Sequence, residues 1–229
     1  ALDNVDLKLG QGEILGLVGD NAAGKSTLMK ILSGNYQPDN GEIIIDGHQK
    51  RFTRPIDARR FGIEMVYQDF ALIPELSVTR NIFLGREKTN RLFGIKTLDD
   101  KGMDLQAHSH LENLGLRIPP VSSAVRELSG GQQQAVAIAR ATGFDAKLVI
   151  MDEPTAALSP RYQQEILTNI DELRGQGISV LLVEQNARLS LAKSDRGYIF
   201  SGGRIIHSGN AKTILDDPDI GKYFLGIPR

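Results

Sequence analysis

The sequence predicts an α/β fold built on a parallel sheet, and two observations lead to this prediction. Short apolar segments rich in β-branched residues alternate with segments of helical periodicity along most of the 229 residues, which is typical of a sheet covered by helices. The segments Ile14–Val18 and Leu148–Met151 are continuously apolar, as expected of strands buried on both faces. Both are far shorter than the ~20 apolar residues that a membrane helix needs.

Strands and helices are expected in a regular order along the chain. The alternation of Val5, Leu7 and Leu9 with polar residues predicts a half-buried strand near the N-terminus. Further strands are expected at 13–18, 41–47, 63–67, 147–152 and 178–183, followed by a hairpin over 198–207. Helices are expected after Lys25, over 131–142, after the Ser159–Pro160 pair and over 211–225.

Strand signals are absent between about residues 70 and 126, where helical stretches such as Leu105–Leu114 occur. We expect a mostly helical insert there, within a single domain whose core comprises residues 1–69 and 127–229. The chain begins with Ala1 rather than Met, so its N-terminus is expected to be truncated.

The composition argues against several classes of site and partner. Lys and Arg total 27 and Asp and Glu total 28, for a net charge of −1, whereas nucleic-acid-binding domains are usually basic. We therefore expect no nucleic-acid partner. The chain has no Cys, which excludes disulfides, thiolate metal sites and Cys nucleophiles.

A glycine-rich segment with the spacing Gly-x-x-x-x-Gly-Lys-Ser follows the strand at 13–18 and opens a helix. The glycines allow backbone N–H groups to curve around an anion, and the helix N-terminus adds positive potential. Lys25 can reach the β- and γ-phosphates of a nucleotide, and the Ser26 hydroxyl can ligate Mg²⁺. The predicted phosphate loop consists of Gly19, Asp20, Asn21, Ala22, Ala23, Gly24, Lys25, Ser26 and Thr27.

A second candidate site lies at the end of the strand at 147–152, where Asp152 and Glu153 follow an apolar run. In P-loop nucleotidases an Asp at this place holds Mg²⁺, and an adjacent carboxylate can polarise an attacking water. By itself this pattern is weak, because many strands end in surface acids. Together with the phosphate loop it predicts a nucleotide-hydrolysing site.

The segment Leu128-Ser129-Gly130-Gly131-Gln132, which we call the signature segment, makes the prediction specific. With the phosphate loop, Gln68 after a strand and the acidic pair, its order and spacing resemble the nucleotide-binding domain of ATP-binding cassette (ABC) proteins over essentially the whole chain. The resemblance implies a P-loop NTPase core with an antiparallel β part and an inserted helical subdomain. It also implies an ATPase that converts ATP and water to ADP and phosphate and that uses Mg²⁺.

By the same resemblance, each motif residue has an expected role. Ser26, Gln68 and Asp152 would surround Mg²⁺, and Glu153 would be the catalytic base. Two copies of the chain would enclose two ATP molecules head to tail, so that the signature segment of one copy contacts the ATP of the other. The contacting residues of that segment would be Ser129, Gly130, Gly131 and Gln132.

The resemblance further implies membrane partners. The helical insert would dock on transmembrane permease subunits at the cytoplasmic face of the inner membrane, with Gln68 as its link to the nucleotide, and a periplasmic binding protein would deliver the substrate. Phe70, Leu72, Ile73 and Pro74 form an apolar patch that either faces the permease or packs into the local core.

Three positions depart from the family pattern. Gln185 stands where the family has a His that contacts the γ-phosphate, and its amide can donate a hydrogen bond but carries no charge. Ser159 stands where the family has an Asp after Ala157-Leu158. Ser keeps a helix N-cap, and the departure leaves undecided whether this position contributes to communication across the dimer. The aromatic residue that stacks on adenine is absent near Ala1, so weaker ATP binding is expected.

The substrate is indicated by resemblance alone. Most of the chain looks like ATPases of monosaccharide importers, particularly fructose-type systems, through residues 19–25, 62–69, 81–87 and 146–158. The last third, through 181–187, 195–198 and 223–226, looks like ATPases of branched-chain amino-acid importers. The leading interpretation is a monosaccharide importer ATPase. The alternatives are a branched-chain amino-acid importer, a soluble ABC ATPase of translation or DNA maintenance, and a nucleotide switch with little turnover.

Overall fold

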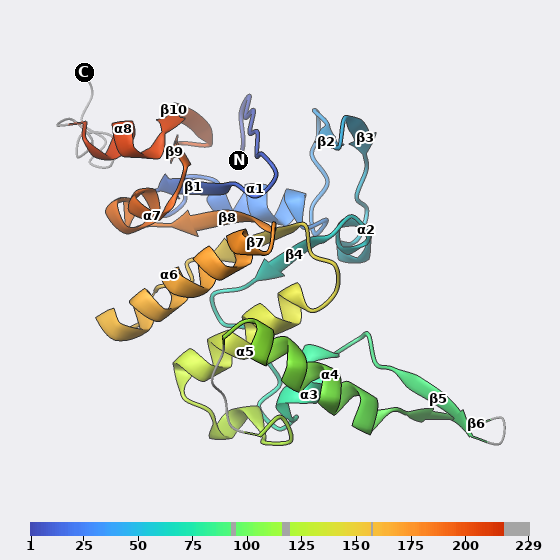
Figure 1. The fold of residues 1–229 in the computed structure, drawn as a ribbon. Coiled ribbons are helices and arrows are strands. Elements are labelled where there is room, and N and C mark those ends of the chain that lie inside the picture. Colours follow the sequence, from blue (N-terminus) through green and yellow to red (C-terminus); the bar gives the residue numbers. More distant parts are fainter. Residues whose placement is uncertain (93–94, 116–119, 157, 218–229) are drawn as a thin grey trace.

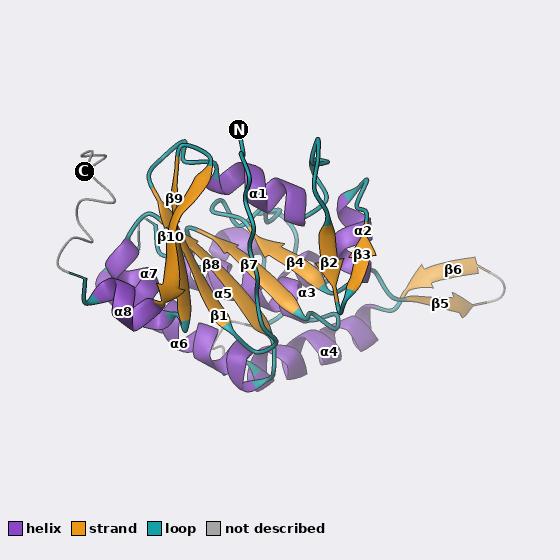
Figure 2. Cartoon of the chain, turned by 90° about the horizontal axis from the view of Figure 1, so that it is seen from above, coloured by secondary structure: helices purple, strands orange, loops and turns teal. Residues whose placement is uncertain are grey.

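The computed structural model describes residues 1–92, 95–115, 120–156 and 158–217. The strands of its central sheet are β1 (Ile14–Gly19), β4 (Ile63–Val66), β7 (Leu148–Asp152), β8 (Ser179–Glu184), β9 (Arg196–Ser201) and β10 (Arg204–Asn210). The six strands are ordered β10-β9-β1-β8-β7-β4, all parallel to their neighbours except the edge strand β10 (Figures 1 and 2). The predicted α/β fold with a parallel sheet and an antiparallel part is confirmed.

Helices flank both faces of the sheet. Helix α1 (Lys25–Leu32) lies above it in Figure 1, and α5 (Gly130–Thr142) and α6 (Pro160–Gly175) lie below it. The remaining elements of the core region are the β2–β3 hairpin (Ile43–Ile45 and His48–Lys50), α2 (Pro55–Arg60), α7 (Ala187–Lys193) and α8 (Ala211–Leu215). Within the described ranges, none of these helices is both long and apolar enough to cross a membrane.

The core has two layers because successive strand residues point to opposite faces of the sheet. Val149 and Met151 of β7 pack in the cluster below the sheet, with side chains from α5 and α6. Ile150 of the same strand packs above it, with Leu28 and Met29 of α1. Burial on both faces explains why these strands read as continuous apolar runs in the sequence.

The insert between residues 70 and 126 contains α3 (Val78–Ile82), α4 (Asp100–Asn113) and a 3₁₀ turn (Val125–Glu127). It also contains a hairpin that the sequence pattern did not predict, formed by β5 (Thr89–Leu92) and β6 (Ile95–Leu98). This hairpin extends away from the rest of the molecule (Figure 2). Residues 89–91 and 95–98 are all exposed, so no alternation of buried and exposed residues marks its strands.

The strand predicted near the N-terminus is wrong. Val5, Leu7 and Leu9 do pack against the upper core cluster, as their alternation indicated. Residues 1–10 form no strand, however, because no described neighbour provides a hydrogen-bonded ladder for them. At the other end, α8 forms the first residues of the helix predicted over 211–225, and residues 218–225 lie outside the described ranges. The segment 223–226, quoted above for its resemblance to branched-chain amino-acid importers, also lies outside them.

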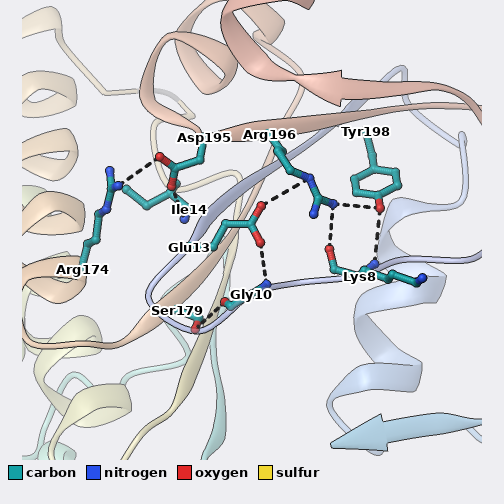
Figure 3. Close-up of polar contacts among 9 residues, drawn as sticks. All are labelled: Lys8, Gly10, Glu13, Ile14, Arg174, Ser179, Asp195, Arg196 and Tyr198. Atoms are coloured by element: carbon teal, nitrogen blue, oxygen red, sulfur yellow. Dashed lines mark hydrogen bonds and ion pairs between the residues drawn. The ribbon is translucent and has the colours of Figure 1, made fainter. Parts of the chain in front are cut away.

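A network of polar contacts joins the amino ends of the central strands (Figure 3). Asp195, before β9, accepts a hydrogen bond from the backbone N–H of Ile14 at 2.9 Å and pairs with Arg174 of α6 at 3.1 Å. The Ser179 hydroxyl donates to the carbonyl of Gly10 at 3.1 Å, and Arg196 donates to the Tyr198 hydroxyl at 3.0 Å. We call this set of contacts the amino-edge network.

Candidate functional site

The predicted site residues gather at the opposite edge of the sheet, where the parallel strands end. β1 ends at Gly19 and enters the phosphate loop, β7 ends at Asp152, and β8 ends just before Gln185. β4 ends two residues before Gln68. Because these strands are parallel neighbours, their carboxyl ends meet along one edge, which is where open α/β sheets bind ligands.

The phosphate loop curves tightly around the start of α1. Gly24, with φ of 107°, has a left-handed backbone, and a Cβ there would lie 3.0 Å from the Leu2 side chain. Lys25 is only 5% exposed. Its ammonium group donates to the carbonyls of Gly19 at 2.6 Å and Asp20 at 3.0 Å. The cation is therefore held beside a helix N-terminus, a favourable position for binding phosphate.

Charges of both signs meet at this edge, where Lys25 is buried and Asp152 and Glu153 are half-buried. Burial lowers the pKa of the Lys25 ammonium, and the nearby charges of Glu153 and Asp152 oppose that shift. Burial raises the pKa of the Asp152 carboxyl, and the negative charge of Glu153 raises it further, against the effect of Lys25. The Asp152 carboxyl therefore lies where its negative charge is disfavoured despite the nearby Lys25.

This donor set fits Mg²⁺. A Ser26 hydroxyl, a Gln68 amide oxygen and an Asp152 carboxylate are oxygen ligands, which Mg²⁺ prefers, and its charge would offset the repulsion between the acids. Within the described ranges, no cluster of three or more His, Cys, Asp or Glu side chains could hold a metal ion by itself. These observations fit an ion held jointly by these residues and the phosphates of a nucleotide.

Gln185 connects two of the predicted site loops. Its side-chain Nε2 donates to Asn21 Oδ1 in the phosphate loop and to Glu153 Oε1, both at 2.7 Å. Glu153 has a left-handed backbone with φ of 47°, and its N–H donates to the carbonyl of Val183 at 2.8 Å. The structure thus brings the predicted base, the predicted γ-phosphate contact and the phosphate loop together.

Two buried side chains behind the acidic pair were not predicted. Glu184 accepts hydrogen bonds from the backbone N–H and the hydroxyl of Thr155, at 2.9 and 2.7 Å, and burial raises the pKa of its carboxyl. Gln134 of α5 is fully buried and donates to the carbonyl of Pro154 at 2.6 Å. No motif marks these residues, because each contact joins segments that are distant in the sequence.

The signature segment lies apart from the phosphate loop. Ser129 caps the N-terminus of α5, and its backbone N–H and hydroxyl both donate to the Gln132 side chain. A Cβ on Gly131 would lie 2.5 Å from the ring of Tyr162, so this position has room only for glycine. Since α5 and α1 lie on opposite sides of the sheet (Figure 1), one chain presents the signature segment away from its own phosphate loop.

The segment that follows Gln68 is divided between core and surface. Gln68 is exposed. Phe70 and Leu72 are half-buried and pack against the lower core cluster, whereas Ile73 and Pro74 are exposed. Of the two alternatives for this apolar patch, local packing therefore applies to Phe70 and Leu72.

Ser159 lies at the N-cap position of α6, as predicted, and Pro160 is its first residue. The Ser159 side chain forms no capping hydrogen bond within the described structure. Ala157, which lies two residues before Ser159 in the same motif, is outside the described ranges.

Comparison with protein families matches residues 2–156 to the family described as ABC transporter. The chain is 44% identical to the xylose/arabinose import ATP-binding protein XylG of Sulfolobus acidocaldarius, over 95% of this chain and 85% of that protein. It is 45% identical to the fructose import ATP-binding protein FrcA of Rhizobium meliloti, over 89% of this chain and 80% of that protein. It matches 42% of the length of the ribose import ATP-binding protein RbsA 1 of Rubrobacter xylanophilus, at 41% identity.

Solved structures give the same result for the fold. The ADP conformation of MJ1267, an ATP-binding cassette of an ABC transporter, matches 99% of this chain and 93% of that chain with a TM-score of 0.83 and 27% identity. The dimeric post-hydrolysis state of the cassette MJ0796 with ADP and phosphate matches 92% of this chain and 90% of that chain with a TM-score of 0.74 and 26% identity. The expected resemblance of the last third to branched-chain amino-acid importers is not supported, because the sugar import protein XylG aligns with 95% of the chain.

Proposed function

Since the chain belongs to the ATP-binding domains of ABC transporters, we propose that it is the ATP-hydrolysing subunit of a monosaccharide importer. The observation that carries the enzymatic part is the contact of Gln185 with both Glu153 and the phosphate loop at 2.7 Å. The sugar is proposed from the relatives, which are import ATP-binding proteins for xylose and arabinose, fructose and ribose.

The proposed reaction is attack of water on the γ-phosphorus of ATP. Glu153 accepts a proton from the water as the new P–O bond forms, and the bond to the β-γ bridging oxygen breaks with its electron pair leaving on ADP. Lys25 and the loop N–H groups hold the phosphates. Gln185 keeps the Glu153 carboxylate beside the phosphate loop. Mg²⁺, when bound by Ser26, Gln68 and Asp152, supplies positive charge to the phosphates.

The active unit is proposed to be a dimer, with a second copy of this chain as the simplest partner. Within one chain α1, which follows the phosphate loop, and α5, which begins in the signature segment, lie on opposite sides of the sheet (Figure 1). The exposed Ser129 and Gly130 at the start of α5 would instead contact ATP bound to the other copy, together with Gly131 and Gln132. Binding of ATP then closes the dimer, and loss of the γ-phosphate releases it.

The permease is proposed to dock on the insert, at the cytoplasmic face of the inner membrane, and a periplasmic binding protein supplies the sugar. The exposed Ile73 and Pro74, five and six residues beyond Gln68, offer an apolar contact next to the nucleotide site. Phe70 and Leu72 are assigned to internal packing instead.

The proposal is tested in two steps with the full-length protein. It is first purified with an affinity tag from detergent-solubilised membranes of its native cells, and its partners are identified by mass spectrometry. Recovery of a permease supports the importer, whereas recovery of ribosomal or DNA-repair proteins without a permease contradicts it.

The purified complex is then reconstituted into proteoliposomes, and ATP-dependent uptake of xylose, fructose, ribose and leucine is compared. The Glu153→Gln variant, which keeps the loop and its partners, is the matched control for hydrolysis. Uptake of a pentose or hexose supports the proposal, and uptake of leucine alone would overturn the sugar assignment.

A further inference from the structure

Two consecutive non-glycine residues after Gln68 have left-handed backbones. Phe70 has φ of 60° and Ala71 has φ of 45°. Residues with a Cβ adopt this region rarely, and they stay there only where surrounding contacts hold them. The turn that they form begins two residues beyond Gln68, so its shape decides where the Gln68 side chain can reach.

The contact that holds this turn comes from α5. Arg140 Nη2 donates to the carbonyl of Phe70 at 2.7 Å, and Nη1 donates to the carbonyl of Ala71 at 2.6 Å. One planar guanidinium thus binds both strained peptide units, a geometry that a lysine ammonium cannot reproduce with its single nitrogen. Burial lowers the pKa of Arg140, and the neighbouring Tyr67 and Glu64 oppose this shift.

The same helix reaches the other site loops. It begins at Gly130 and is capped by Ser129, both in the signature segment, and its Gln134 side chain donates to the carbonyl of Pro154, next to Glu153. Gln134 and Arg140 are six residues apart, about one and two-thirds turns, so they point to different sides of the helix. Helix α5 therefore contacts both the turn at Phe70 and Ala71, which we call the Gln68 turn, and the segment that follows Glu153.

A second side chain holds the next part of the segment. Asn81 of α3 is fully buried, donates to the carbonyls of Ile73 and Leu76 and accepts from the N–H of Ile73 at 2.7 Å. The segment from Gln68 into the insert is thus held by α5 at one place and by α3 at another. The Phe70 N–H also donates to the carbonyl of Tyr67 at 2.9 Å, and Arg140 binds the carbonyls of both left-handed residues.

We propose that Arg140 is a positioning residue that fastens the Gln68 turn to α5, so that a nucleotide contact at Gln68 displaces the signature segment. The inference rests on the proposed function. Arg140 is expected to affect the rate of hydrolysis only by positioning Gln68. Arg140 itself touches neither the phosphate loop nor the acidic pair in the described contacts.

The first test is a double-mutant cycle on ATP hydrolysis by the full chain with its permease. Arg140→Lys is expected to lower the rate by about tenfold, a size typical of coupled side chains. In a Gln68→Ala background the same substitution is expected to lower it less than twofold. Equal losses in both backgrounds would show that Arg140 acts independently of Gln68 and would overturn the proposal.

Arg80→Lys is the matched control, because Arg80 lies in the same insert as the turn and pairs with Asp100 at 2.6 Å, whereas its described contacts do not include the turn. It is expected to leave the rate unchanged. A parent chain that hydrolyses no ATP would refute the proposed function, whereas an active parent with equal losses would refute only the role of Arg140.

The second test uses fluorescence and needs no turnover. The chain has no Trp, so Tyr67→Trp places a unique emitter beside Gln68. A non-hydrolysable ATP analogue is expected to shift its emission, and Arg140→Lys is expected to reduce that shift by at least half at saturating analogue, whereas Arg80→Lys is not. An unchanged shift in Arg140→Lys would contradict the proposal.

Discussion

The two edges of the central sheet are built in opposite ways from the same strands. At the amino edge, polar side chains pair with one another and with strand backbones, as Asp195 does with Ile14 and Arg174 (Figure 3). At the carboxyl edge, burial raises the pKa of Asp152, and Glu153 has a left-handed backbone. The comparison teaches that both edges form hydrogen bonds, but the carboxyl edge also keeps an acid, Asp152, whose negative charge is disfavoured by burial and by Glu153 and would be stabilised by a bound cation.

The largest effect is expected at the carboxyl edge. Glu153→Gln removes the proposed proton acceptor and should lower phosphate release by about 10²–10⁴-fold, the usual contribution of general base catalysis. The Gln185 amide can still face the new side chain, so thermal stability should change little. Phosphate release and equilibrium ATP binding are measured in parallel. Retained hydrolysis would remove Glu153 as the base.

The next effect is expected at the amino edge, and it is on stability. Asp195→Ala leaves the Ile14 N–H without its acceptor and breaks the pair with Arg174, which should lower the free energy of unfolding by about 1–3 kcal/mol. Denaturant unfolding measures this loss. The rate of ATP hydrolysis per folded molecule should stay within about twofold of the wild type. A larger fall would show that the site at the carboxyl edge depends on contacts at the amino edge.

Gln185→His adds a titratable group to the carboxyl edge alone, so it separates the two edges by the pH dependence of the rate. An imidazolium beside Glu153 would lower the basicity of that carboxylate, so the rate relative to wild type should fall by up to about tenfold on acidification through pH ~6.5. Phosphate release from pH 5.5 to 8 measures the ratio. A large gain in turnover at every pH would instead indicate that the natural chain is a switch with little turnover.

The smallest effect is a gain in stability. The pKa of Asp152 is raised in the folded protein, so its ionisation opposes folding, and this cost is absent below the unfolded pKa of ~3.9 and grows as the pH rises through the folded value. Asp152→Asn should therefore raise the melting temperature at pH 7 but not at pH 3.5. A lower melting temperature at pH 7 would show that Asp152 contributes to stability as well.

The carboxyl edge was largely predictable because its motifs are local. The phosphate loop and the acidic pair each occupy a few consecutive residues, and the parallel strands of the sheet bring their loops to one edge. The half-buried N-terminal segment was predicted as a strand because alternation reports burial, whereas a strand also needs a hydrogen-bonded neighbour.

The contacts that tie the loops together were not predictable. Arg140 lies 69 positions from Ala71, and Thr155 lies 29 positions from Glu184, so no short pattern links either pair. The β5–β6 hairpin was missed for a different reason, since its exposed strands bury no face and leave no periodic signal.

Gln185 has a genetic consequence. Glutamine and histidine codons differ only in their third base, so a single nucleotide change replaces the amide that joins Asn21 and Glu153 with an imidazole. A population carrying this gene can therefore reach an imidazole at this position, and with it the pH dependence expected of Gln185→His, in one mutational step.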